Sequence, residues 1–214
     1  MLYGPGFLYL WPPRPETAIA PMSPQFQTMK SRPNFIAQLK MNGQRNVLYF
    51  SPDGDIQWWN RHGGHHQNYT PPTWLEEEIR SVVQFRGKWI VIDGELLHNK
   101  DKTIKNHLYW WDILVLDNDY LVGKTLAERQ EMLSGTLRPP VSETTGVFRL
   151  SEHISVARNI LPEMYDEMWQ QTEVSYIEGF VFKHLNAKLM PCVGKKNNSS
   201  WQVRCRKTHK GYAF

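Results

Sequence analysis

The sequence predicts an α+β fold with largely antiparallel sheets. Short apolar segments typical of strands mix with helical patterns, and the two do not alternate regularly as they do in a parallel βαβ sheet. The 214 residues are 41% hydrophobic and 21% charged. This composition is typical of a globular protein, and it excludes a disordered chain, a collagen-like chain and a coiled coil.

The first part of the chain predicts an arm followed by a hairpin. Residues 1–33 are rich in proline and lack a period, so we expect an extended N-terminal arm with turns. Residues 34–39 form a short strand candidate. Residues 47–50 and 56–59 flank the turn sequence Ser51-Pro52-Asp53-Gly54, which favours a β-hairpin.

The middle of the chain predicts a helix and two strands. Thr73 with Glu76 three residues later matches a capping box, and apolar residues at helical spacing follow. Residues 89–92 read as an apolar strand that ends at Asp93-Gly94-Glu95. A second strand is expected over residues 108–116.

The last part of the chain predicts two helices and three strands. Thr125 and Glu128 match another capping box, which opens a short helix to about residue 133. Residues 154–171 look helical, with a break or second start at Pro162. The strands are expected over residues 147–150, 176–183 and 201–206.

Apolar runs and cysteines indicate the cellular setting. The longest apolar runs fall far short of the ~20 residues that a membrane span needs. The start of the chain lacks the basic residues and cleavage site of a secretory signal. Cys192 and Cys205 are the two cysteines, and a chain of this size buries a core without a disulfide. We therefore expect a reducing, cytoplasmic location and no membrane partner.

Positive charge gathers near the C-terminus. The net charge is +4, and the segment from Lys183 to Lys210 contains no Asp or Glu. Such a basic segment suits a phosphate-rich partner, although a solvated tail that keeps the protein soluble is the alternative. Its basic residues are Lys183, Lys188, Lys195, Lys196, Arg204, Arg206, Lys207 and Lys210.

Lys40 is a candidate nucleophile. It follows a strand and precedes Gly43 and Arg45, so it is expected on a tight turn. An amine attacks phosphorus only when it is unprotonated, and nearby cations such as Arg45 or desolvation would lower its pKa. Alone, this pattern is weak, because a lysine near a glycine is common.

Carboxylates and one aromatic residue also mark strand ends. Glu95 closes one apolar strand and Glu178 begins another, and carboxylates there are candidate ligands for Mg²⁺. Trp111 precedes Asp112 on one strand, and Arg61 lies in a polar loop. Taken singly, these residues are equally explained by turns, core packing and an exposed surface.

The order of these segments resembles the covalent nucleotidyltransferase superfamily, which comprises ATP-dependent polynucleotide ligases and messenger-RNA capping guanylyltransferases. The resemblance covers about residues 35–207, and its specificity lies in the joint order and spacing of short motifs. Lys40 to Arg45 resembles the motif Lys-x-Asp-Gly-x-Arg. The other matching segments are Arg61 to Gly63, Val91 to Leu96, Leu108 to Leu114, Leu126 to Leu133, Ile177 to Lys183 and Trp201 to Arg206.

Two positions depart from the family pattern. Asn42 stands where the family usually has Asp, which removes a negative charge. Arg204 and Arg206 align with a Lys-x-Lys motif, and arginine clamps phosphate but does not donate a proton as a lysine can. A shifted register that uses Lys207 stays open.

The resemblance implies a mechanism and a site. Lys40 would attack the α-phosphorus of ATP and form lysyl-AMP, and Mg²⁺ or Mn²⁺ would assist at Glu95 and Glu178. Trp111 would stack on the adenine, and Arg204 and Arg206 would contact the α-phosphate. The nucleotide-binding residues implied are Gln38, Arg45, Arg61, Glu95, Trp111, Arg204 and Arg206.

The resemblance also implies an architecture and a partner. Residues 34–214 would form an ATP-grasp-like adenylation domain of two twisted, mainly antiparallel sheets with flanking helices, without a C-terminal oligonucleotide-binding (OB) domain. The expected activity is sealing of 5′-phosphate/3′-hydroxyl nicks by a monomer, with duplex DNA favoured over RNA. The expected nucleic-acid contacts are Lys183, Lys195, Lys196 and Lys207.

Three alternatives stay open at this point. An RNA ligase and a capping-type enzyme share the motifs, and a nucleic-acid-binding module that has lost catalysis would explain Asn42 and the arginine pair. Arg45 two residues after Gly43 and the Glu178-Gly179 pair favour a DNA ligase. The location would be cytoplasmic, in the host cell if a virus encodes the protein.

Overall fold

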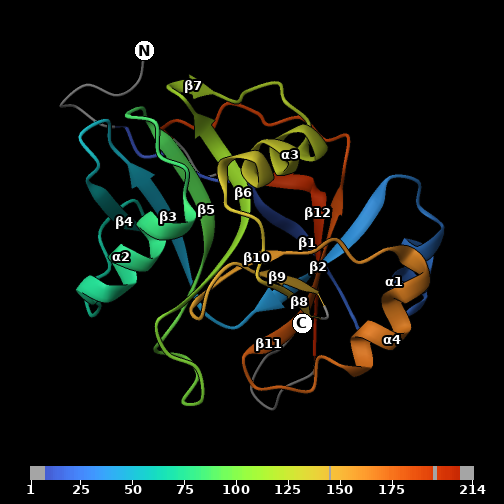
Figure 1. Ribbon diagram of the computed structural model, residues 1–214. Helices are drawn as coiled ribbons and strands as arrows, with labels where there is room; N and C mark the ends of the chain where they lie inside the picture. Colours follow the sequence, from blue (N-terminus) through green and yellow to red (C-terminus); the bar gives the residue numbers. More distant parts are fainter. Residues whose placement is uncertain (1–7, 145, 195–196, 208–214) are drawn as a thin grey trace.

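Two β-sheets form the frame of the protein (Figure 1). The computed structural model describes residues 8–144, 146–194 and 197–207. These residues form one four-stranded and one eight-stranded sheet together with four α-helices. The predicted α+β class with two mainly antiparallel sheets is confirmed.

The eight-stranded sheet carries the predicted hairpin and the central strands. β3 and β4 pair antiparallel around the turn, and the central pairs β3–β5 and β5–β6 are also antiparallel. Along the sheet the order is β4 (Ile56–Asn60), β3 (Gln44–Phe50), β5 (Ile90–Leu97), β6 (His107–Leu116), β10 (Ile154–Ala157), β9 (Val147–Arg149) and β8 (Ser142–Thr144), and β7 (Asp119–Tyr120) pairs with β6.

The four-stranded sheet joins segments from both ends of the chain. Its order is β1 (Arg14–Ile19), β12 (Asn198–Arg206), β11 (Ile177–His184) and β2 (Phe35–Met41). Successive residues of a strand face opposite sides. One face is therefore apolar, with Leu39, Phe180 and Cys205 buried in a core. The other face presents polar residues such as Lys40 and Arg204.

Four helices cover the sheets, and two of them test the capping predictions. α3 (Leu126–Thr136) begins with the predicted capping box of Thr125 and Glu128. α2 (Thr73–Val82) does not, because its N-cap is Pro72 without a side-chain hydrogen bond. Instead, Glu76 accepts a hydrogen bond from Trp58 Nε1 at 3.1 Å. The other two α-helices are α1 (Pro24–Ser31) and α4 (Tyr165–Gln170), and the 3₁₀-helix η1 (Pro162–Met164) directly precedes α4.

A hydrophobic core supports each sheet. The larger core packs α2 and α3 against the eight-stranded sheet, and the second packs α1 and α4 against the four-stranded sheet. A buried ion pair between Arg129 of α3 and Asp112 of β6, with Nε–Oδ1 2.8 Å apart, ties helix to sheet. Within the described ranges, every helix is too short or too polar to cross a bilayer.

Two segments differ from the sequence-based expectation. The expected arm contains β1 and α1, and β1 pairs in parallel with β12 from the other end of the chain. Residues 154–171 are not one helix, because Ile154–Ala157 forms β10 beside β6. Both strands are short, and their partners are distant in sequence, so no local period reveals them.

Candidate active site

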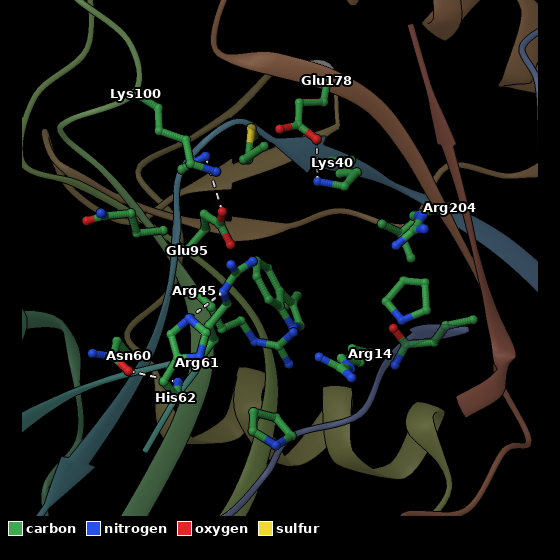
Figure 2. Close-up of a pocket in the computed structure, with 18 of the residues that line it drawn as sticks. Arg14, Lys40, Arg45, Asn60, Arg61, His62, Glu95, Lys100, Glu178 and Arg204 are labelled. Atoms are coloured by element: carbon green, nitrogen blue, oxygen red, sulfur yellow. Dashed lines mark hydrogen bonds and ion pairs between the residues drawn. The ribbon is translucent and has the colours of Figure 1, made fainter. Parts of the chain in front are cut away.

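A cavity of about 950 Å³ is lined by both sheets (Figure 2). Its walls come from the polar face of the four-stranded sheet and from β3, β5 and β6 of the larger sheet. The structure thus brings together side chains that lie far apart in the sequence. The predicted site residues that line it are Gln38, Lys40, Arg45, Arg61, Glu95, Trp111, Glu178, Lys183, Arg204 and Arg206.

Lys40 meets Glu178 across the pair β2–β11. Lys40 Nζ lies 2.5 Å from Glu178 Oε2, and the two side chains are 19% and 15% exposed. Arg206 Nε of β12 lies 3.2 Å from the same oxygen. The carboxylate therefore holds the amine between strands and shares its charge with two cations. An amine held in this way must lose its proton before it can attack an electrophile.

The backbone at position 179 requires a glycine after Glu178. Its φ is +139°, and a Cβ there would lie 2.3 Å from the backbone oxygen of Cys205. The register of β11 against β2 also shifts between Ile177 and Gly179. A bulge of this kind re-aims the intervening side chain. The Glu-Gly pair is thus required locally to direct Glu178 toward Lys40.

Glu95 is fixed by the turn that follows Lys40. Gly43 N donates a hydrogen bond to Glu95 Oε1 at 3.1 Å, and a Cβ on Gly43 would lie 2.5 Å from Glu95 Cγ. Burial raises the pKa of Glu95, while the charges of Lys40, Arg45 and Lys100 oppose that shift. The close approach explains why the Lys40 turn needs a glycine.

Arg45 is already engaged by Asp93. Arg45 Nε donates to Asp93 Oδ1 at 2.5 Å, and Arg45 Nη2 pairs with the other oxygen. Trp111 Nε1 also donates to Asp93, at 2.8 Å from Oδ2, and the Arg45 guanidinium lies 5.0 Å from the Trp111 ring. Asp93, to which the sequence analysis gave no role of its own, therefore organises two predicted site residues.

Lys183 lies inside the cavity. The residue is only 4% exposed, and its Nζ lies 5.4 Å from the centre of the Trp111 ring. Burial lowers the pKa of Lys183 to about 7, although Asp112 and Asp93 favour its charged form. Lys183 therefore lines the cavity rather than an exposed surface, and its expected contact with nucleic acid stays a prediction.

Gln38 presents an unpaired acceptor. Its Nε2 donates to Asn159 Oδ1 at 3.0 Å, and Asn159 in turn bonds Gln130. Gln38 is 2% exposed, and its buried Oε1 has no hydrogen-bond partner among the described residues. A buried unpaired acceptor that lines a cavity is suited to a donor group of a ligand.

The remaining predicted residues lie at the rim or elsewhere. Arg61 follows β4 in an exposed turn, where its Nε lies 3.0 Å from His62 Nε2. Asn42 N donates to Tyr176 O at 2.8 Å. Asn42, which stands where the motif has Asp, thus ties the turn after Lys40 to the residue before β11. Lys207 is not among the residues that line the cavity. Lys195 and Lys196 lie outside the described residues.

Several residues that line the cavity were not predicted from the sequence. Arg14 and Glu16 come from β1, which was expected to be an arm, and Lys100 follows β5. Asn60 and His62 flank Arg61. The cluster of lysines after Glu95 is a signal that could have indicated Lys100, whereas Arg14 is placed by a pairing with β12 that local sequence does not reveal.

Glu95 and Glu178 are suited to bind a hard cation whose remaining ligands are phosphate oxygens. No group of three His, Cys, Asp or Glu side chains able to hold a metal ion forms within residues 8–144, 146–194 and 197–207. Mg²⁺, however, is usually bound through one or two carboxylates plus phosphate oxygens. Both carboxylates line the cavity, and the charge of Glu178 acts on Glu95.

Comparisons with known proteins show the fold. No family model and no curated protein sequence matches the chain. The ligase domain of LigD from M. tuberculosis is similar, with a TM-score of 0.58 and 15% identity over 91% of this chain and 58% of that one. A mycobacterial DNA ligase D complexed with ATP and MES gives a TM-score of 0.58 and 14% identity over 92% and 60%.

A third structure extends the comparison. The protein named Pmar-Lig_Pre gives a TM-score of 0.61 and 14% identity over 94% of this chain and 47% of that one. The chain thus spans 47–60% of the length of these similar structures. The fold of a ligase nucleotidyltransferase domain, which the motifs indicated, is confirmed.

Proposed function

We propose that the chain is an ATP-dependent nucleic-acid ligase that seals 5′-phosphate/3′-hydroxyl nicks in duplex DNA through a lysyl-AMP intermediate. The observation that carries this proposal is Lys40 in the cavity beside Glu178 and Arg206. An amine, a carboxylate and a guanidinium meet there within a fold shared with DNA ligase structures. One of those structures was solved with ATP.

Lys40 acts as the nucleophile in the first step. Its neutral Nζ attacks the α-phosphorus of the substrate ATP, the bond from that phosphorus to the bridging oxygen breaks, and pyrophosphate leaves. Nζ loses one further proton as the phosphoramidate forms. Arg206 and Arg204 of β12 stabilise the negative charge that develops on the α-phosphate oxygens.

The walls of the cavity orient the nucleoside. Gln38 Oε1, buried and unpaired, accepts a hydrogen bond from the amino group of adenine. Trp111 is partly buried and held by Asp93, so its ring offers a fixed surface for the base. Glu95, anchored by Gly43 N, accepts from a ribose hydroxyl.

A divalent cation has a place beside these groups. Glu95 and Glu178 would hold Mg²⁺ or Mn²⁺, which would neutralise phosphate charge when bound. Glu178 also contacts the Lys40 amine, with Lys40 Nζ 2.5 Å from Glu178 Oε2. Its carboxylate therefore keeps the nucleophile aligned with the cavity.

The second and third steps transfer AMP and join the strands. An oxygen of the 5′-phosphate attacks the α-phosphorus of lysyl-AMP, the P–N bond breaks, and Nζ regains a proton. The 3′-hydroxyl then attacks the activated 5′-phosphate, loses its proton and displaces AMP. Lys40 is thereby returned to its starting state.

DNA is the proposed substrate because of two local features. Arg45 follows Gly43 by two residues as in DNA ligases, and Glu178 rather than Asp precedes Gly179. Arg45 and Glu178 both line the cavity. RNA is the other outcome that the experiment distinguishes.

Transfer of label from ATP labelled at the α-phosphate tests the proposal. We expect the wild-type chain to retain label through denaturation and the Lys40→Ala variant to retain none, because among the described residues no other lysine pairs with Glu178. Lys30→Ala, which removes a surface lysine paired with Asp166, should label like the wild type.

Labelled enzyme then separates DNA from RNA. Transfer of AMP to a 5′-phosphorylated nick in DNA, faster than to the same nick in RNA, supports the proposed substrate. A wild-type chain that takes no label would contradict the proposal and favour a binding module that has lost catalysis.

A further inference from the structure

Arg14 lies at the wall of the cavity, where hydrogen bonds hold its backbone. It opens β1, and its backbone N donates to Asn197 O at 3.1 Å, while its backbone oxygen accepts from Ser199 Oγ at 3.2 Å. Asn197, just before β12, and Ser199 of β12 therefore hold the backbone of Arg14 at both its N–H and its C=O. A side chain on such an edge strand starts from a defined backbone rather than from a loose arm.

The guanidinium of Arg14 is oriented but not neutralised. Its Nε donates to the amide oxygen of Asn198 at 2.6 Å. Among the described residues, neither terminal nitrogen of Arg14 makes a hydrogen bond or an ion pair, although Glu16 also lines the cavity. An arginine held at Nε presents its two outer nitrogens as a planar fork, which matches the geometry of phosphate oxygens.

Arg204 brings a second positive charge to the same wall. After burial and the charge of Arg206, the charge of Arg14 also lowers the pKa of Arg204. Arg206 is balanced by Glu178, whereas no carboxylate within the described ranges pairs with Arg204. Figure 2 shows Arg14 and Arg204 together on one side of the cavity. Two neighbouring like charges without a counter-ion are stabilised when an anion binds between them.

We infer that Arg14 of β1 joins Arg204 of β12 in binding a phosphate group inside the cavity. The identity of that phosphate rests on the proposed function, which offers two sources: the phosphates of ATP and the 5′-phosphate of the nick. Both present the same chemistry to a guanidinium fork. The N-terminal segment thus contributes a ligand-binding residue and not only an edge strand.

Equilibrium binding of inorganic tripolyphosphate tests the subsite without requiring catalysis. We expect Arg14→Ala to weaken binding by about tenfold, the loss typical of a charged hydrogen-bonding partner. Arg14→Gln should weaken it similarly, because glutamine can still meet Asn198 but carries no charge. Arg32→Ala is the matched control, since it removes an exposed arginine that does not line the cavity.

Two outcomes of the binding measurement would contradict a role of Arg14 in phosphate binding. Tripolyphosphate that binds Arg14→Gln as tightly as the wild type would exclude Arg14 from the subsite. An equal loss in Arg32→Ala would show that only net charge matters, and would also overturn it. Circular dichroism melting identifies a variant that does not fold, and Arg14→Gln decides if Arg14→Ala is unfolded.

Two activity measurements then distinguish the sources. A higher ATP concentration for half-maximal labelling in Arg14→Gln, with unchanged sealing by pre-adenylated enzyme, assigns the site to the phosphates of ATP. Slower sealing with unchanged labelling assigns it to the 5′-phosphate. Wild-type rates in both arms overturn the inference. If the wild-type chain takes no label, the proposed function fails, and tripolyphosphate binding still decides the subsite.

Discussion

Lys183 pays a desolvation cost that depends on pH. Burial lowers its pKa from 10.5 to about 7, with Arg45 and Arg129 adding repulsion and Asp112 and Asp93 opposing it. The unfolded chain therefore binds more protons between pH 7 and 10.5, so this residue makes stability rise with pH in that window. Below about pH 7 the residue is charged in both states, and the cost is fully present.

The Lys183→Met variant isolates this effect. We expect it to be more stable than the wild type, and the gain to be larger at pH 6 than at pH 9 by about 1–3 kcal/mol. Urea unfolding at both pH values measures the difference. Lys188→Met, which replaces an exposed lysine, should show no such pH dependence. A gain that is equal at both pH values would contradict the lowered pKa.

At the scale of elements, Gly179 sets how closely β11 and β12 approach. A Cβ at this position would meet the Cys205 backbone oxygen at 2.3 Å, and the φ of +139° is one that side chains rarely adopt. We therefore expect Gly179→Ala to lower the free energy of unfolding by about 3 kcal/mol or more. Because Glu178 would also shift, lysyl-AMP formation should fall.

Gly135→Ala is the matched control for this substitution. Gly135 lies in α3, and nothing is within 4 Å of a Cβ there. Alanine should stabilise that helix by up to about 1 kcal/mol and leave labelling unchanged. Thermal unfolding of both variants checks the contrast. A Gly179→Ala variant as stable as the wild type would contradict the prediction, because β11 and β12 would then accommodate a Cβ at this position without cost.

At the scale of the whole molecule, net charge and its placement predict salt-sensitive binding. The chain carries +4 overall, and several cations line one cavity. Binding through phosphate contacts releases counter-ions, so we expect the dissociation constant for nicked duplex to rise about ten- to hundredfold between 50 and 200 mM salt. Fluorescence anisotropy across a salt series measures it. A change below about twofold would contradict phosphate contacts as the main source of affinity.

Much of the fold was predictable where the signal is local. The hairpin of β3 and β4 follows from its turn sequence, and the capping box of α3 fixes where that helix begins. β10 was not predictable as a strand, because four residues lack a distinct period and their pairing with β6 decides their conformation. α2 forms as predicted, but Glu76 bonds Trp58 instead of its own N-terminus.

The sequence alone determined which chemical groups are present and in what order. Lys40, Glu95, Trp111, Glu178 and the arginine pair were recognisable because short motifs require particular residues at fixed spacing. These side chains all line one cavity. Their individual roles stay predictions until labelling and binding are measured.

Only the tertiary structure decided the partners of these groups. Arg45 is held by Asp93, and Lys183 is buried over Trp111. Arg14 lines the cavity because β1, near the N-terminus, pairs with β12, near the C-terminus. Each contact joins segments that are remote in sequence. The period of two along a strand predicts which face of the sheet a side chain lies on, but it does not predict which residue lies opposite. That information resides in strand pairing, which local sequence does not encode.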